Sequence, residues 1–159
     1  MDTIDLTLIL TRLFTNSQTN FLGVVASDRK PSLRSVTTFA PCCYVLNIDP
    51  KSEPGTHWVA IYHPTPQHVE FFDSYGSHPS DYGIYFDASL QLHFNNIKFQ
   101  TLVSSVCGQY CIYFLSLRSH GHSFQNIQKH LSQISHFKSD QLVYSFVQDL
   151  AKRMKVNKI

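Results

Sequence analysis

The chain has 159 residues, of which 43% are hydrophobic and 15% are charged, a balance typical of a globular protein rather than a disordered one. This length is enough for a hydrophobic core, and we expect a single domain over residues 1–159. The formal net charge of +2 is too small to indicate nucleic-acid binding by itself. The basic segment 152–158 is better explained as a solvated helix end whose cations suit the helix dipole.

The N-terminal segment lacks the features of a secretory signal peptide, and no apolar run approaches the roughly 20 residues of a membrane helix. We therefore expect an intracellular protein that has no membrane partner and is not secreted. In a reducing compartment its cysteines stay thiols, at Cys42, Cys43, Cys107 and Cys111. No CxxC pair has a matching second pair, so the sequence indicates neither a zinc site nor any other required cofactor.

The hydrophobic pattern predicts a helix over residues 3–14, although alternating apolar residues there also suit a strand. Residues 15–38 are polar and irregular apart from an apolar run at 21–25, and we expect a loop around Pro31. Strands are predicted at 43–48, 58–62 and 69–72, with a further short strand at 97–100. Their nearly continuous apolar runs are typical of a sheet covered on both faces.

Three helices complete the predicted chain, one over 105–118, one beginning near Ser123, and one beginning at Ser139 or Asp140. The first of them places Cys107 in the first turn of a buried helix, with Ser104 or Ser105 as its N-cap. A thiol at this position lies at the positive end of the helix dipole, which favours the thiolate. Taken alone, the segment suits a buried core cysteine equally well, because free cysteine is often buried.

Two residues upstream supply partners for a reactive thiol. His57 begins the second strand and Asp73 follows the third, and these two strands are predicted to form a hairpin. Both residues then lie at the same edge of the sheet, where neighbouring strands are about 4.8 Å apart, so we expect them to meet. An acid beside an imidazole fixes its tautomer and stabilises the imidazolium. Glu70 is a weaker choice of acid, because strand alternation places it on a solvent face.

A nucleophile also needs donors that stabilise a developing oxyanion. Gln100 lies seven residues before Cys107 and is the best side-chain candidate, together with the backbone N–H of Cys107. Gln91 and Gln109 are alternatives, but Gln109 lies inside the predicted helix. Cys111 shares a helix face with Cys107, and packing explains it better than a resolving thiol does.

The ordered segments GTHW at 55–58, FFDSYG at 71–76 and VCGQYC at 106–111, with Gln100 before the last, resemble the adenovirus endopeptidase (adenain) family of cysteine proteases. That family lies within a wider group that includes the ubiquitin-like-protein proteases. Further similar segments cover much of the chain, at 20–23, 40–43 and 141–146. The likeness therefore extends from about residue 20 to about residue 150.

The resemblance implies an α+β, papain-like cysteine protease fold, with a central, mostly antiparallel sheet flanked by helices and the nucleophile at a helix N-terminus. It also implies that Cys107 is the nucleophile, His57 the general base, Asp73 its orienting acid and Gln100 part of the oxyanion hole, with Trp58 packed beside the site. The implied activity is cleavage of viral capsid or core precursors at glycine-containing sites during virion maturation. The implied location is the virion and the host nucleus or cytoplasm, with a monomeric enzyme and with DNA and an activating viral peptide as possible cofactors.

The sequence departs from the adenoviral pattern in three ways. The acid is Asp73, whereas the adenoviral enzymes have glutamate at this point. Between Cys43 and Cys107 there is no cysteine that could join an activating peptide through a disulfide. The chain is also shorter, which points to a minimal relative from another virus or from a Polinton-type transposon. Two alternatives stay open: an isopeptidase acting on ubiquitin or a ubiquitin-like modifier, and a non-catalytic nucleic-acid-binding virion protein of the same fold.

Overall fold

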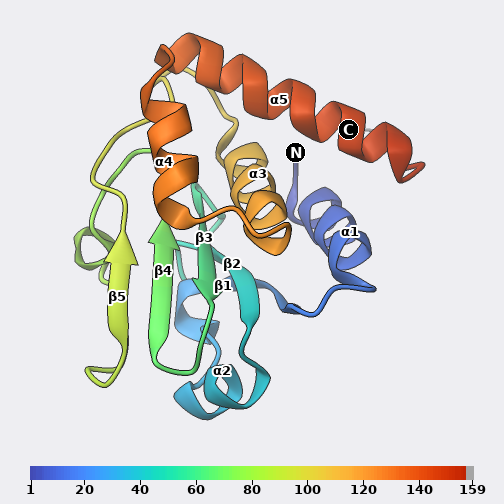
Figure 1. Ribbon diagram of the computed structural model, residues 1–159. Helices are drawn as coiled ribbons and strands as arrows, with labels where there is room; N and C mark the ends of the chain where they lie inside the picture. The colour runs from blue at the N-terminus through green and yellow to red at the C-terminus, as the bar shows by residue number, and fades with distance from the viewer. Residues whose placement is uncertain (157–159) are drawn as a thin grey trace.

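The computed structural model describes residues 1–156, and its architecture is α+β, with a mixed sheet and helices on both of its faces (Figure 1). The strands of this described part are β1 (Asn20–Ala26), β2 (Cys42–Asn47), β3 (Trp58–His63), β4 (His68–Phe72) and β5 (Gln91–Phe94). The α-helices are α1 (Thr3–Phe14), α2 (Leu33–Phe39), α3 (Cys107–Ser119), α4 (Phe124–Ser132) and α5 (His136–Arg153). Two short 3-10 helices lie at η1 (Ser27–Arg29) and η2 (Pro79–Tyr82).

The strands of the sheet follow one another in chain order, β1-β2-β3-β4-β5. The pairs β2–β3 and β3–β4 are antiparallel, whereas β1–β2 and β4–β5 are parallel. The prediction of a mostly antiparallel sheet was therefore wrong at both edges. A parallel pair needs a long crossover connection, and the segments 27–41 and 73–90 provide one on each side of the central hairpin.

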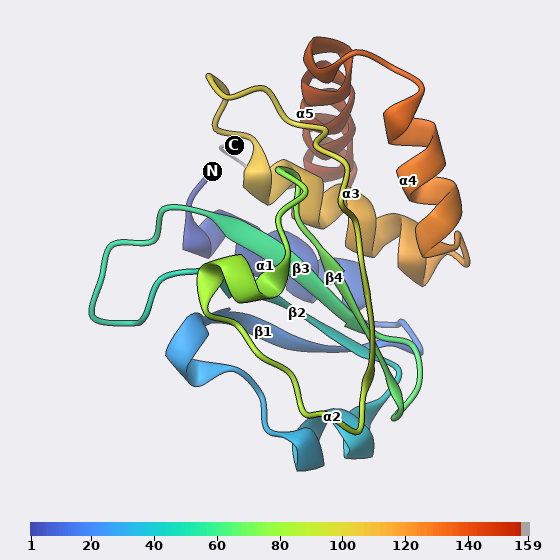
Figure 2. The ribbon, with the colours of Figure 1, turned by 90° about the vertical axis from the view of Figure 1, so that its left-hand side faces the viewer.

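Both faces of the central strands are covered, as their apolar runs predicted. Helices α1 and α3 pack on one face, where α5 lies over α3, and α2 lies on the other face (Figure 2). Side chains alternate between the two layers, so Cys43 and Val45 face α3 while Cys42 and Tyr44 face the α2 side. All four cysteines lie in the described chain and are buried free thiols, in agreement with the sequence.

The N-terminal segment forms the predicted helix rather than a strand. Asp2 caps α1 through a capping box, in which its carboxylate accepts hydrogen bonds from the N–H groups of Ile4 and Asp5. The apolar run at 21–25, to which the sequence assigned no element, lies in β1, and the loop expected around Pro31 was wrong in part, because α2 begins at Leu33. The hydrophobic signal is weak there: β1 is an edge strand interrupted by Gly23 at φ +110°, and α2 buries Val36 alone among its residues.

The C-terminal half shows two further differences from the sequence prediction. Residues 97–100, predicted as a strand, form a loop. The strand β5, which was not predicted, precedes this loop in the chain and pairs with β4. Helix α4 begins after its Ser123 cap as predicted, but α5 begins at His136, capped by Ser135. The predicted starts at Ser139 and Asp140 instead lie buried within α5.

The basic C-terminal segment agrees with its prediction as far as it is described. Lys152 and Arg153 occupy the last turn of α5, where cations suit the helix dipole. Residues 157 and 158 of that segment lie outside the described residues. None of the helices within residues 1–156 has the length and apolar character needed to cross a membrane.

Candidate active site

Cys107 is the first residue of α3, the helix that lies across the centre of the sheet. The predicted caps Ser104 and Ser105 were wrong, because Val106 occupies the N-cap position and no side chain of residues 1–156 caps the helix. The Ser104 hydroxyl instead donates to the Thr101 carbonyl. A capping side chain would occupy the free N–H groups of the first turn, so its absence leaves them directed at the thiol.

The environment of the Cys107 thiol favours the thiolate, although the residue is only 9% exposed. Burial opposes ionisation, but the interactions of the thiol with the His57 side chain and with the backbones of Trp58 and Gly108 outweigh it. The pKa of Cys107 is therefore lowered from its ordinary value of 9.0. This is the electrostatic state that a nucleophilic cysteine requires.

His57 lies between the thiol and a carboxylate. It precedes β3, and its Nε2 lies 2.6 Å from Oδ1 of Asp73, which follows β4. The register of the two strands brings them together, since Ala60 pairs with Phe72 at the same end of the hairpin. With Nε2 directed at Asp73, the second ring nitrogen, Nδ1, is left available for the Cys107 thiol, which interacts with the imidazole.

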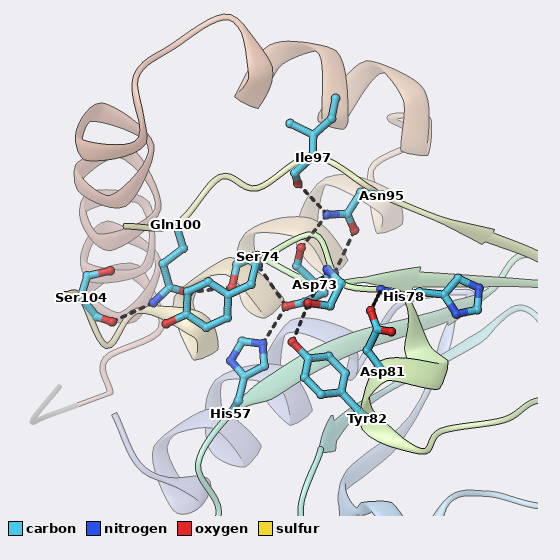
Figure 3. Close-up of polar contacts among 12 residues, drawn as sticks. His57, Asp73, Ser74, His78, Asp81, Tyr82, Asn95, Ile97, Gln100 and Ser104 are labelled. Carbon is cyan, nitrogen blue, oxygen red and sulfur yellow. Dashed lines mark hydrogen bonds and ion pairs between the residues drawn. The ribbon is translucent and has the colours of Figure 1, made fainter. Parts of the chain in front are cut away.

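The Asp73 carboxylate is fully buried and accepts four hydrogen bonds (Figure 3). Besides His57, its donors are the backbone N–H groups of Tyr75 and Ser77, each at 3.0 Å, and the Tyr82 hydroxyl at 2.8 Å. Burial alone would raise the pKa of Asp73. The hydrogen bond and positive charge of His57, together with hydrogen bonds from Tyr75 and Tyr82, instead lower the pKa below 3.8. The acid therefore stays ionised beside the imidazole.

The His57 imidazole is itself 6% exposed. Burial lowers its pKa, but hydrogen bonds and charge from Asp73 and Cys107 raise the pKa to about 9. The Tyr75 ring lies against the imidazole, with 4.8 Å between the ring centroids. Below about pH 9 the imidazole is therefore protonated beside the ionised Asp73, and its charge favours the thiolate form of Cys107.

Asn95, which the sequence did not single out, fixes the backbone of the acid. Its amide oxygen accepts from the Asp73 N–H at 2.9 Å, and its amide nitrogen donates to the Asp73 carbonyl at 2.5 Å and to the Ile97 carbonyl at 3.1 Å (Figure 3). The side chain is fully buried. Asn95 thus links the end of β4 to the chain after β5, and no local pattern predicts a contact across 22 residues.

The polar contacts of Gln100 do not include the other predicted site residues His57, Asp73 and Cys107. Within the described chain, its polar contacts go to Ser74, whose hydroxyl donates to Oε1 at 2.6 Å, and to the Ser104 carbonyl, which accepts from Nε2 at 3.0 Å (Figure 3). The side chain is fully buried. Gln100 therefore reaches the site through Ser74, the residue directly after Asp73.

Gly108 permits the close packing that the helix start requires. A Cβ at this position would lie 3.0 Å from Sδ of Met1 and 3.3 Å from Cε3 of Trp58. A side chain here would push against the indole of Trp58, the residue whose backbone interacts with the Cys107 thiol. Trp58 therefore packs beside the site, as the resemblance implied.

Two side chains near the site have structural roles. Cys111 is 1% exposed, and its burial raises its pKa well above 9.0, so it is a core thiol rather than a reactive one. Glu70 was expected on a solvent face, and this was wrong, because it is buried in a bidentate ion pair with Arg118, both bonds being 2.8 Å long. That pairing removes Glu70 from competition with Asp73.

The described residues contain no group of three or more histidine, cysteine or acidic side chains placed to hold a metal ion. A scan against protein-family models and a search of the curated proteins find no match for this chain. The geometry of the site and the residue pattern are therefore what supports a functional assignment.

Proposed function

We propose that this protein is a cysteine endopeptidase of a papain-like, adenain-related type, with Cys107 as nucleophile, His57 as acid–base catalyst and Asp73 as orienting acid. The observation that carries the proposal is the His57–Asp73 pair at 2.6 Å beside Cys107 at the start of α3, where the neighbouring imidazole lowers the pKa of the thiol. A buried aspartate could hold a structural histidine, but a structural pair would not lower the pKa of a cysteine at an uncapped helix start.

In the first step the Cys107 thiolate attacks the carbonyl carbon of the scissile peptide bond, and a C–S bond forms while the carbonyl oxygen becomes an oxyanion. Donors near the start of α3, with the Gln100 amide, are assigned to that oxyanion. The C–N bond then breaks, and the His57 imidazolium gives its proton to the leaving amine. The product of this half-reaction is a thioacyl-enzyme with neutral His57.

In the second step His57 takes a proton from water, whose oxygen attacks the thioacyl carbon. Collapse of that intermediate breaks the C–S bond and releases the carboxylic acid, which loses its proton to solvent, and the thiolate and imidazolium are restored. Asp73 stabilises the imidazolium in both resting and transition states, and its four hydrogen bonds keep it from rotating away.

Two surface hollows that include neighbours of Cys107 are candidate binding regions for a polypeptide substrate. One, of about 420 Å3, is lined in part by Trp58 and Gly55 and carries charged side chains of both signs. The other, of about 350 Å3, is almost wholly apolar and is lined in part by Val103, Val106 and Phe137. Trp58 interacts with Cys107 and Val106 precedes it in the chain, so each hollow shares one lining residue with the surroundings of the thiol, although Cys107 itself lines neither. The family resemblance adds glycine-containing viral precursor proteins as the substrate class.

The test is hydrolysis of a fluorogenic peptide library that includes Gly-Gly and Gly-X sequences, by the wild type and by Cys107→Ala. We expect cleavage by the wild type and none by Cys107→Ala, while Cys111→Ala, which removes the second thiol of the same helix, keeps activity. Circular dichroism and thermal unfolding check that each variant is folded. Cleavage by a folded Cys107→Ala protein would overturn the assignment.

The same assay separates the two alternative activities. Faster reaction of the enzyme with a ubiquitin-type C-terminal probe than with a capsid-type glycine peptide would favour the isopeptidase. Absence of labelling by any thiol-directed suicide substrate would favour the non-catalytic protein. DNA and an activating peptide enter the proposal through the resemblance alone, and their addition to the assay, with a salt titration for DNA, tests them.

A further inference from the structure

The orientation of the Gln100 amide is fixed by two contacts of different kinds. The Ser104 carbonyl can only accept a hydrogen bond, so the amide atom that faces it must be Nε2. The atom that faces Ser74 is then Oε1, which accepts the Ser74 hydroxyl proton at 2.6 Å. Both Gln100 and Ser74 are removed from solvent, at 0% and 2% exposed, so water does not replace either contact.

We propose that Ser74 is a positioning residue that sets the Gln100 amide for the oxyanion of the reaction, a role that rests on the proposed function. One hydrogen of Nε2 is donated to the Ser104 carbonyl, and the second is the one that the proposed function assigns to the oxyanion, which the fully buried amide would meet once substrate is bound. If the Ser74 hydroxyl is lost, Oε1 becomes a buried acceptor without its donor, and the amide can rotate toward another partner. Rotation takes the second N–H out of line with the reacting carbonyl.

The position of Ser74 joins the two halves of the site. Asp73 orients the base through His57, and the next residue orients the amide through Gln100. The Ser74 carbonyl also accepts from the N–H groups of Phe99 and Gln100, at 2.8 and 3.0 Å, which ties the Gln100 backbone to the same residue. Consecutive residues at the end of β4 thereby fix both the acid–base group and the amide.

The variants Ser74→Ala, Ser74→Thr and Gln100→Ala test the proposal, with Ser116→Ala as the control for removal of a buried hydroxyl elsewhere. Loss of one oxyanion donor costs about 10²–10³ in kcat, so we expect at least about a 100-fold fall for Gln100→Ala. Misplacement of a donor costs less, and we expect about a 10-fold fall for Ser74→Ala with KM unchanged. Ser74→Thr restores the hydroxyl and most of the rate, and Ser116→Ala leaves kcat unchanged.

Two further measurements separate positioning from a general structural effect. The double variant Ser74→Ala/Gln100→Ala should have the kcat of Gln100→Ala alone, because Ser74 acts through that side chain. The rate of Cys107 alkylation by iodoacetamide, a reaction that forms no oxyanion, should be unchanged in Ser74→Ala. Additive losses in the double variant, or a parallel fall in alkylation, would overturn the proposal.

A readout without catalysis distinguishes failure of this inference from failure of the proposed function. In the wild type the Gln100 side-chain N–H groups should give one slowly exchanging pair of NMR resonances, which Ser74→Ala should make exchange faster. If the wild type cleaves peptides while Ser74→Ala keeps its full kcat, the positioning role is wrong and the protease stands. If the wild type cleaves no peptide, the protease is wrong, and the NMR exchange rates alone decide whether Ser74 holds the amide.

Discussion

The imidazole Nε2 of His57 lies 2.6 Å from the Asp73 carboxylate, and the two side chains are 7% and 0% exposed. A buried carboxylate at this distance raises the pKa of the imidazole, and the imidazolium in turn lowers the pKa of Cys107. The reactivity of the thiol therefore depends on a residue that does not contact it. Each of the following predictions changes one part of this arrangement or of the frame that holds it.

The activity should have an alkaline limit set by His57. His57 must be protonated to give its proton to the leaving amine. Its pKa is raised to about 9, so kcat/KM should fall as the pH rises through about 9. On the acid side, activity is lost as the pH falls through the pKa of Cys107, because the thiolate is then protonated. That pKa is lowered from 9.0, so the acid limit lies below pH 9.0. A profile of kcat/KM from about pH 5 to about pH 10 checks both limits. A limit at the ordinary histidine pKa of 6.5 would contradict the ion pair.

Asp73→Asn should lower activity by removing the charge that keeps His57 protonated. The pKa of His57 then falls and that of Cys107 rises, so the thiolate becomes scarcer at neutral pH. We expect kcat to drop by about 10² or more, against about 10⁴ when the acid of a serine protease triad is lost. Iodoacetamide alkylation of Cys107 at pH 7 should slow in parallel, and an unchanged alkylation profile would show that Asp73 does not act through His57.

The same substitution should change the acid stability of the fold. The pKa of Asp73 is depressed when folded, so its stabilising effect is present above the unfolded value of 3.8 and is lost as the pH falls through the lower folded value. The free energy of unfolding of the wild type should exceed that of Asp73→Asn by about 1–3 kcal/mol at pH 6, a typical range for hydrogen bonds to a charged group. Urea unfolding at decreasing pH should show this difference shrinking below pH 3.8.

The contacts that the sequence could predict are those set by local pattern. A hairpin brings a histidine before one strand to an aspartate after the next, and this placed His57 and Asp73 correctly. The position of Cys107 at a helix start follows from the apolar run behind it, but its missing cap does not, because Ser104 and Ser105 are favoured cap residues.

The contacts that the sequence could not predict join distant segments through single side chains. Asn95 reaches Asp73 across 22 residues, and Ser74 reaches Gln100 across 26. Neither pair has a periodicity or a motif of its own. Strands β1 and β5 were missed for a related reason, since edge strands bury fewer side chains and their apolar pattern is weak. Long-range pairing, rather than local preference, decides these parts of the fold.

The Glu70–Arg118 pair should contribute strongly to stability and little to catalysis. The pair is bidentate and mostly buried, and the guanidinium also lies 4.5 Å from the centre of the Tyr62 ring. Removing one partner of a buried pair costs about 3–5 kcal/mol, so Glu70→Ala should lower the free energy of unfolding by about that amount. Replacing both residues by Glu70→Leu and Arg118→Met should recover part of the loss. A shift of less than about 1 kcal/mol for Glu70→Ala, the level of a surface ion pair, would contradict this role.

Gly76→Ala should disturb the turn that presents the acid. Gly76 has φ +73°, its N–H donates to the Asp73 carbonyl at 2.9 Å, and a Cβ here would lie 2.6 Å from the backbone carbon of Ile97. Because that neighbour is backbone, the turn itself must move, and the Ser77 N–H then leaves the Asp73 carboxylate.

Gly83→Ala is the matched control, since Gly83 has φ +68° but a Cβ there would meet no atom of the described residues within 4 Å. The left-handed conformation alone costs an alanine about 1–2 kcal/mol, and we expect that loss of stability for Gly83→Ala with kcat/KM preserved. For Gly76→Ala we expect a larger loss of stability together with a fall in kcat/KM, measured by urea unfolding and peptide hydrolysis. Equal effects of the two substitutions would mean that the contact with Ile97 does not constrain Asp73, and that the acid is held by Asn95 and Tyr82 without the turn.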